Sequence, residues 1–176
     1  MTRSVVLVAG SPAENSRSSR VLEALGRSLQ SRGFEPERYA VGDFALDELV
    51  YGRAEGESVQ RFLRSIANAR AVVFSTPVYK ATYAGALKLI IDLIAPTGLE
   101  HKALLAITTA RLEPHLALVD ESFQRLYAFF QGSIGLRSLG LNDAQLRVDG
   151  ASGIELDASA RVAFDEALAR LLGAVQ

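Results

Sequence analysis

The sequence predicts an α/β fold in which helices cover both faces of a five-stranded parallel sheet, a doubly wound sandwich. Two observations lead to this prediction. Short apolar runs rich in β-branched residues, such as residues 4–9 and 71–76, are typical of strands buried on both faces of a parallel sheet. Between these runs, apolar residues recur three or four positions apart, as in amphipathic helices. The two patterns alternate, and helices are the usual crossovers between parallel strands.

The predicted elements follow one another from the amino terminus. The length of 176 residues suits one compact domain, so residues 1–176 are expected to form a single unit. A sheet of this size typically has the flavodoxin-like strand order 2-1-3-4-5. Pro114 suits the first turn of a helix, and Asp157 suits an N-cap. The strands are predicted at 4–9, 35–41, 71–76, 102–108 and 134–141, with 145–148 as a candidate addition to the last; the helices at 18–31, 58–68, 83–93, 114–130 and 157–172; and connections at 43–56 and 77–82.

Composition excludes several classes of protein. The chain has 19 Lys and Arg residues against 20 Asp and Glu, a net charge of −1. Such a near-neutral chain lacks the excess of positive charge that is typical of proteins that bind nucleic acid or an anionic membrane. It has no Cys, which excludes disulfides, thiolate metal sites and a cysteine nucleophile. The only histidines, His101 and His115, have no carboxylates at metal-ligand spacing, so no metal site is predicted. No signal peptide and no apolar stretch of 18 residues is present, and a cytoplasmic protein is expected.

The first predicted connection is rich in hydrogen-bond donors. In such sheets, ligands bind beyond the carboxyl ends of the strands, here near residues 10–19, 76–83 and 108–114. Residues 10–19 read Gly-Ser-Pro-Ala-Glu-Asn-Ser-Arg-Ser-Ser and precede a helix amino terminus, where backbone N–H groups and the helix dipole favour an anion. A phosphate is the expected ligand. The alternative is that these side chains only stabilise a turn and cap the helix. The segment matches neither the dinucleotide fingerprint nor the P-loop.

The second connection carries an aromatic side chain. Pro77 stiffens the chain as it leaves the strand, and Tyr79 can lie beside a flat ligand. A tyrosine in a loop also commonly serves packing alone, so both interpretations stay open here.

Taken together, these segments resemble the NAD(P)H-dependent FMN reductases. Gly10-Ser11-Pro12 with Ser16-Arg17-Ser18-Ser19, then Thr76-Pro77-Val78-Tyr79-Lys80 and Tyr83-x-Gly85-Ala86-Leu87-Lys88, carry the resemblance. It is strongest to the reductases that supply reduced flavin to alkanesulfonate monooxygenases, and it extends through most of the chain. The resemblance implies FMN and NAD(P)H as cofactors. By this resemblance, Ser11, Arg17, Ser18 and Ser19 hold the FMN phosphate, and Pro77, Val78 and Tyr79 flank the isoalloxazine ring.

The third connection departs from the family pattern. Relatives usually have two glycines after the fourth strand, whereas this chain has Thr109, Ala110 and Arg111, which are expected beside the ring. The implied activity is reduction of FMN by NAD(P)H, with reduced flavin passed to a partner monooxygenase. Hydride transfer to a flavin requires no catalytic side chain. The alternatives are a quinone or azo reductase with bound FMN, and a flavin-binding relative without turnover.

Two further expectations concern assembly and the reductant. The stretch 84–93 is apolar almost all round, which predicts burial in the monomer or in a subunit interface. The resemblance to the FMN reductases implies a homodimer or homotetramer. No ribose-binding signature distinguishes NADH from NADPH.

Overall fold

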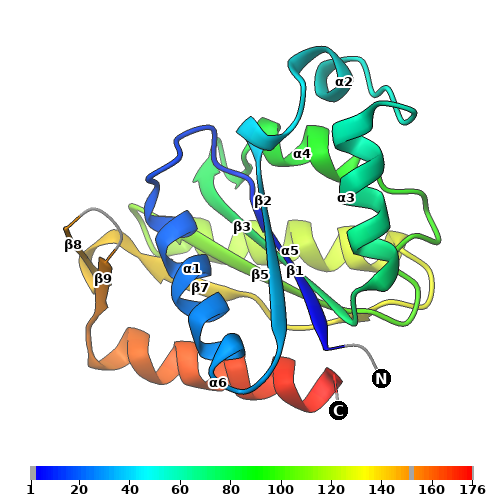
Figure 1. Ribbon diagram of the computed structural model, residues 1–176. Helices are drawn as coiled ribbons and strands as arrows, with labels where there is room; N and C mark the ends of the chain where they lie inside the picture. The colour runs from blue at the N-terminus through cyan, green and yellow to red at the C-terminus, as the bar shows by residue number, and fades with distance from the viewer. Residues whose placement is uncertain (1–2, 151–152, 176) are drawn as a thin grey trace.

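Three layers make up the structure, a computed structural model that describes residues 3–150 and 153–175 (Figure 1). The central parallel sheet has the order β2-β1-β3-β5, and β6 and β7 both pair with β5 on its far side. With β6 and β7 as two halves of the predicted fifth strand, the predicted order is confirmed. These strands are β1 (Ser4–Ala9), β2 (Glu35–Ala40), β3 (Ala71–Tyr79), β5 (Ala103–Ala110), β6 (Ile134–Gly135) and β7 (Leu139–Asn142).

Helices cover both faces of the sheet (Figure 1). Successive side chains of a strand point to opposite faces. In β1, Val5 and Leu7 therefore pack into the core with α1 and α6, whereas Val6 and Val8 pack into the core with α3, α4 and α5. The helices on the first face are α1 (Arg17–Gln30) and α6 (Ala158–Val175), and those on the second are α3 (Glu57–Asn68), α4 (Gly85–Ile91) and α5 (Pro114–Phe129).

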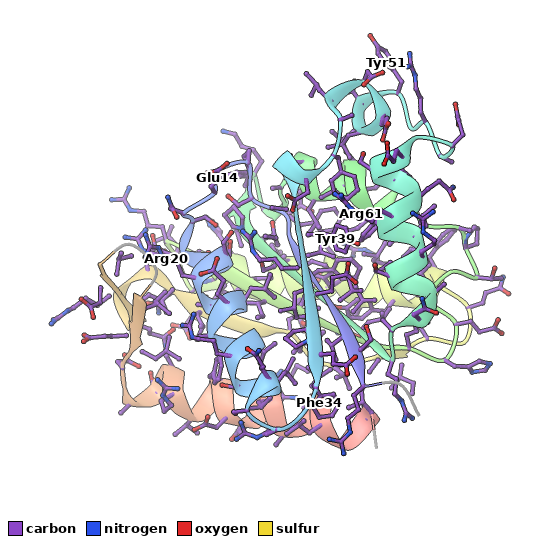
Figure 2. All side chains as sticks on the ribbon, viewed as in Figure 1. Glu14, Arg20, Phe34, Tyr39, Tyr51 and Arg61 are labelled. Carbon is purple, nitrogen blue, oxygen red and sulfur yellow. The ribbon has the colours of Figure 1, made fainter. Side chains whose placement is uncertain are left out.

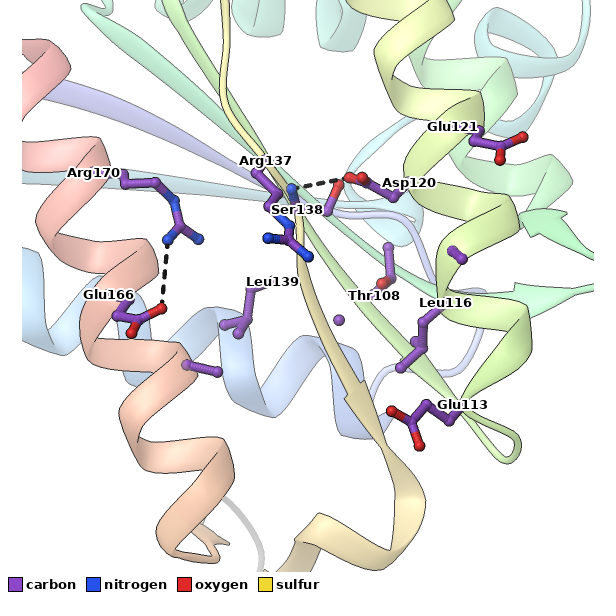
Figure 3. A pocket seen from close by; sticks show the side chains of 13 residues that line it. Thr108, Glu113, Leu116, Asp120, Glu121, Arg137, Ser138, Leu139, Glu166 and Arg170 are labelled. Atoms are coloured by element: carbon purple, nitrogen blue, oxygen red, sulfur yellow. Dashed lines mark hydrogen bonds and ion pairs between the residues drawn. The ribbon is translucent and has the colours of Figure 1, made fainter.

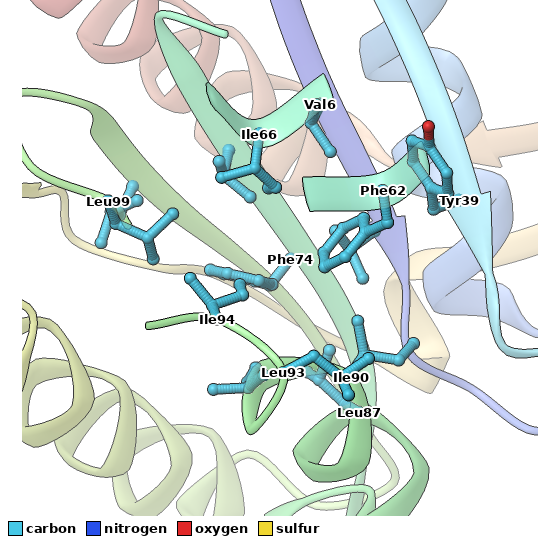
Figure 4. Close-up of a cluster of buried hydrophobic side chains, with 14 of the residues drawn as sticks. Val6, Tyr39, Phe62, Ile66, Phe74, Leu87, Ile90, Leu93, Ile94 and Leu99 are labelled. Carbon is cyan, nitrogen blue, oxygen red and sulfur yellow. The ribbon is translucent and has the colours of Figure 1, made fainter. Parts of the chain in front are cut away.

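The core between the sheet and helices α3, α4 and α5 is here called the second core. Aromatic and branched side chains fill it (Figure 4). The ring of Phe62 on α3 meets that of Tyr39 on β2 edge-on, with 5.1 Å between centroids. Burying an apolar side chain of this size stabilises the fold by roughly 1.5–3 kcal/mol. Leu87, Ile90 and Ile91 of α4 are buried here, within the chain's own core. The apolar character of α4 is therefore accounted for without a subunit interface.

The connection predicted at residues 77–82 is mostly strand, so that prediction is wrong. β3 runs on to Tyr79 and turns back into the short antiparallel strand β4 (Thr82–Tyr83). Pro77 does not end the strand, since it stays in register with Thr109 of β5. Lys80 and Ala81 make the turn, with φ of +51° and +64°. Positive φ at both central residues is the geometry of a two-residue hairpin turn.

Four further parts of the chain differ from prediction. Residues 145–148 do not join the main sheet: β8 (Leu146–Asp149) pairs with β9 (Gly153–Leu156) as a separate hairpin after the 3-10 turn η2 (Asp143–Gln145). The predicted connection at 43–56 contains α2 (Leu46–Val50), and the turn η1 (Val41–Asp43) ends β2 one residue early. Finally, β5 extends to Ala110, two residues beyond the predicted end. Among the described residues, no helix is long and apolar enough to cross a membrane.

Candidate functional site

The amino end of α1 gathers three serine hydroxyls. Ser16 is the N-cap, and its Oγ accepts the backbone N–H of Ser19 at 3.2 Å. The same oxygen lies 3.1 Å from Ser18 Oγ and 2.8 Å from Ser19 Oγ. Upstream, Ser11 Oγ accepts the N–H of Ala13 at 3.1 Å and shapes the turn after β1. A ring of hydroxyls at the positive end of a 14-residue helix is a donor set that suits a phosphate.

The predicted phosphate residues differ in how an anion can reach them. Ser11, Ser18 and Ser19 are buried, whereas Arg17 is exposed and Ser16 is half-buried. An incoming anion would therefore meet Arg17 and Ser16 directly. The hydroxyls of Ser18 and Ser19 stand behind Ser16 and are hydrogen-bonded to it. Sequence reasoning placed Ser16 in this segment but did not assign it to the phosphate.

The hairpin β3–β4 is anchored beside this cluster. Thr76 Oγ1 accepts the N–H of Ala84 at 2.9 Å and donates to the carbonyl of Pro77 at 2.8 Å, which ties the hairpin to the start of α4. Val78 packs against the second core, and Tyr79 is 48% exposed. The structure thus presents the ring of Tyr79 to solvent on a braced strand end.

The three predicted segments meet at one edge of the sheet. Gly10 N–H donates to the carbonyl of Ser75 at 2.8 Å, which joins the end of β1 to β3. Pro77 lies in register with Thr109 of β5. Thr109 and Ala110 are buried strand residues, and the exposed Arg111 follows them. The predicted phosphate residues and ring-flanking residues therefore come from neighbouring strand ends.

Two arginines near the start of α1 fasten a distant segment to this helix; sequence reasoning missed Arg20, and it missed the partner of Arg17. Arg20 is buried; its Nε donates to Asn15 O at 3.3 Å, and its Nη1 donates to the carbonyls of Gly150 and Gly153 at 3.1 and 3.2 Å. Figure 2 shows Arg20 between α1 and the β8–β9 hairpin. Arg17 Nη1 donates to Asp143 Oδ2 at 3.3 Å. Gly150, Gly153 and Asp143 lie more than 120 positions from these arginines along the chain, and no local sequence pattern predicts the contacts.

A cavity of about 550 Å³ opens at the β7 edge of the sheet, between α5 and α6 (Figure 3). Of the predicted segments it contacts Thr108 and Glu113 only. Thr108 Oγ1, Ser138 Oγ and Arg170 Nε are buried along it without a hydrogen-bond partner among the described residues. Four carboxylates and two guanidinium groups line it, so the lining does not select a single class of ligand. The cavity is separate from the serine cluster of α1.

The titratable groups with shifted pKa lie elsewhere. Burial raises the pKa of Tyr39 and of Tyr127 and lowers the pKa of Lys102. Hydrogen bonds, from the Ser58 hydroxyl and from the Ala160 N–H respectively, lower the pKa of Glu48 and of Asp157. None of these five groups belongs to the three predicted segments. Among the described residues, no group of His, Asp and Glu is arranged to hold a metal ion.

Comparison with known proteins identifies the family. The family model "NADPH-dependent FMN reductase" matches residues 3–142, which include all three segments. The chain belongs to this family. An FMN reductase (NADPH) of Pseudomonas putida is 35% identical over 142 residues, 81% of this chain and 72% of that protein. The FMN reductase (NADPH) of Escherichia coli is 31% identical over 81% of this chain and 74% of its own length.

Other relatives extend the comparison. The NADH-dependent FMN reductase SfnE of Pseudomonas putida is 28% identical over 93% of this chain and 90% of that protein. An apo NADH:FMN oxidoreductase (EMOB) superposes with a TM-score of 0.85 at 21% identity, over 96% of this chain and 87% of that one. FerB, an NAD(P)H:acceptor oxidoreductase of Paracoccus denitrificans, has a TM-score of 0.67 at 18% identity, over 98% and 96% of the two chains. These structures confirm the flavodoxin-like fold.

Proposed function

We propose that this chain reduces FMN with NAD(P)H and releases the reduced flavin to a partner monooxygenase. One observation carries the proposal: the serine and arginine donors of α1, the exposed Tyr79 and the end of β5 lie at neighbouring strand ends of one sheet edge. Bound FMN would supply the hydride acceptor, so the protein's task is to hold and orient the flavin and the nicotinamide. Family membership and the names of the relatives point the same way.

In this proposal, α1 holds the phosphate. Arg17 offers its guanidinium, and Ser18 and Ser19, with Ser16, supply hydroxyls at the helix amino terminus. Ser11 fixes the turn through which the phosphate would enter, because its hydroxyl accepts the N–H of Ala13.

The flavin ring is proposed to lie between two walls. The β3–β4 hairpin gives one wall through Pro77, Val78 and Tyr79, and the end of β5 gives the other through Thr109, Ala110 and Arg111. Thr109 and Ala110 are small strand residues, so they permit close approach at this edge. The nicotinamide would stack on the open ring face, where rate depends on holding the reacting atoms close together.

The reductant and the partner are finer parts of the proposal. Relatives are named for NADPH and for NADH, so the family name does not choose between them. A monooxygenase that consumes reduced flavin is the proposed partner, and the cytoplasm, where NAD(P)H is available, is the proposed location. A homodimer or homotetramer is also proposed, supported by the 60% exposed Phe129 beside an apolar groove of about 400 Å³ between α4 and α5.

A single assay tests the function against its alternatives. Oxidation of NADH and of NADPH is followed at 340 nm, with the purified chain alone and with added FMN, riboflavin or a quinone. The proposal predicts oxidation that requires added FMN. Quinone-dependent oxidation by protein that keeps FMN through gel filtration would instead identify a quinone reductase. FMN binding without any oxidation would indicate a relative without turnover.

A further inference from the structure

Arg17 already has an anionic partner within the chain. Its Nη1 lies 3.3 Å from Asp143 Oδ2, and the two side chains are 47% and 34% exposed. Arg17 is the first residue of α1, so the carboxylate of Asp143 sits near the positive end of the helix. A flavin phosphate held by Arg17 would have to compete with this carboxylate.

Asp143 is held on a braced turn. It opens η2, directly after the cap residue Asn142. Asn142 Oδ1 accepts the N–H groups of Ala144 and Gln145, and Gln145 Oε1 accepts the N–H of Asn142 at 2.9 Å. Gln145 Nε2 in turn donates to Ser159 Oγ of α6 at 2.9 Å. The turn that carries Asp143 is therefore held at the end of β7 and against α6.

Arg17 and Arg20 of α1 fasten the segment after β7 in different ways. Arg20 is buried and donates to the neutral carbonyls of Gly150 and Gly153, a contact that an incoming anion cannot reach. Arg17 forms a solvent-exposed ion pair with Asp143. Such a pair is weak because solvent screens it, so another anion can replace the carboxylate. Arg20 thus keeps the segment in place while Arg17 can change partner.

We propose that Asp143 is a built-in competitor for Arg17 that weakens binding of the flavin phosphate and so favours release of the flavin. Asp143 would therefore be a specificity-determining residue that lowers the preference of the site for FMN over riboflavin. The inference rests on the proposed function, since it requires the phosphate to bind at Arg17.

The test compares Asp143→Asn with the wild type. Asn keeps the shape and removes the charge, so FMN affinity, measured by quenching of flavin fluorescence, should rise roughly 1.5- to fivefold, as for an exposed ion pair. Riboflavin affinity should stay unchanged, because riboflavin has no phosphate. The gain should shrink in 1 M salt, where charges are screened over about 3 Å. Asp149→Asn, an equal charge change at an exposed position of the β8–β9 hairpin, should leave both affinities unchanged.

Arg17→Ala separates failure of this inference from failure of the proposed function. If Arg17→Ala weakens FMN, and Asp143→Asn raises FMN affinity in the wild type but not in the Arg17→Ala background, the competitor role is supported. An equal gain in both backgrounds would overturn it. If Arg17→Ala weakens FMN but Asp143→Asn alone leaves FMN affinity unchanged or lowers it, only the competitor role is overturned. If Arg17→Ala leaves FMN affinity unchanged, the phosphate site itself is wrong.

Discussion

Thr76 shows how one hydroxyl positions part of the proposed site. It is fully buried, and it accepts the N–H of Ala84 while donating to Pro77 O. Thr76→Val keeps the shape but leaves the Ala84 N–H without its partner. We expect a loss of about 1–3 kcal/mol in the free energy of unfolding, measured in urea, because a buried donor is left unsatisfied.

The exposed Thr82 of β4 offers the matched control. Thr82→Val should change the free energy of unfolding by less than about 0.5 kcal/mol. Equal effects of the two substitutions would mean that the Thr76 hydroxyl does not anchor the hairpin.

At the same scale, sequence reasoning reached the residues of the serine segment but not their partners. Ser11 and Ser16 to Ser19 stand in one short segment before a helix, and that local pattern is readable. Arg20 looks like an ordinary helix residue, yet it is buried against Gly150 and Gly153. Such a contact depends on the whole fold, because the separation is about 130 positions.

Among the elements, the β3–β4 turn stores backbone strain. Ala81 has a φ of +64°, a region that disfavours side chains with a Cβ. Ala81→Gly should raise the free energy of unfolding by about 0.5–1 kcal/mol, since relief of strain exceeds the entropy that Gly adds to the unfolded chain. Thermal unfolding measures the effect. Ala169→Gly, at an exposed position in the interior of α6, is the contrasting control and should destabilise. If Ala81→Gly lowered the free energy of unfolding, the claim that the β3–β4 turn is strained at Ala81 would be wrong.

A second element, the α2–α3 junction, carries a pH dependence. Glu48 of α2 accepts N–H groups from Glu57 and Ser58 at the start of α3, and the Ser58 hydroxyl contributes most to the lowered pKa of Glu48. Since the pKa is lower in the folded state, the stabilising effect is present above about pH 4.5 and is lost as pH falls through the folded value.

Amide hydrogen exchange in α3 between pH 3 and 6 tests this dependence. After correction for intrinsic exchange, protection in the wild type should fall with acid, and Glu48→Gln should flatten that fall. Glu55→Gln, an exposed carboxyl in the same connection, should keep the wild-type profile. A Glu48→Gln variant with the wild-type profile would show that Glu48 does not cap α3.

Element by element, prediction succeeded where burial alone sets the pattern. β1 and the core of β3 are apolar on both faces, so their strands were readable from composition. α2 was missed because residues 43–56 show no period, and Glu48 rather than an apolar stripe secures it. Residues 145–148 were predicted as a candidate addition to the last strand of the main sheet, but Gln145 lies in η2 and residues 146–148 pair with β9. A short strand's partner depends on the chain path, which local composition does not contain.

For the whole molecule, assembly is the open prediction. The sequence argument relied on the apolar 84–93 stretch, yet Leu87, Ile90 and Ile91 are buried in the monomer. Exposed apolar surface lies instead at Phe129, next to Leu126 and Ile94 in the α4–α5 groove. Light scattering over a dilution series should give a dimer or tetramer, and Phe129→Glu should shift it towards monomer. A wild-type monomer at all concentrations would contradict the prediction.

The architecture explains why one edge of the sheet can serve as the site. Parallel strands bring the ends of β1, β3 and β5 together, and α1 points its amino terminus at the same edge (Figure 1). The sequence pattern predicts the parallel strands, whereas their order was taken from what is typical of a sheet of this size, since the pattern alone does not fix strand order. The segment after β7, which adds Asp143, follows from tertiary contacts alone.

The central claim is that the amino end of α1 binds the phosphate of FMN. Fluorescence titration of FMN and of riboflavin with the Arg17→Ala, Ser18→Ala double variant tests it most directly. Losing charge-assisted hydrogen bonds should weaken FMN at least about tenfold, while riboflavin changes less than about twofold. Equal losses for both flavins, or FMN affinity as in the wild type, would place the phosphate elsewhere and contradict the account.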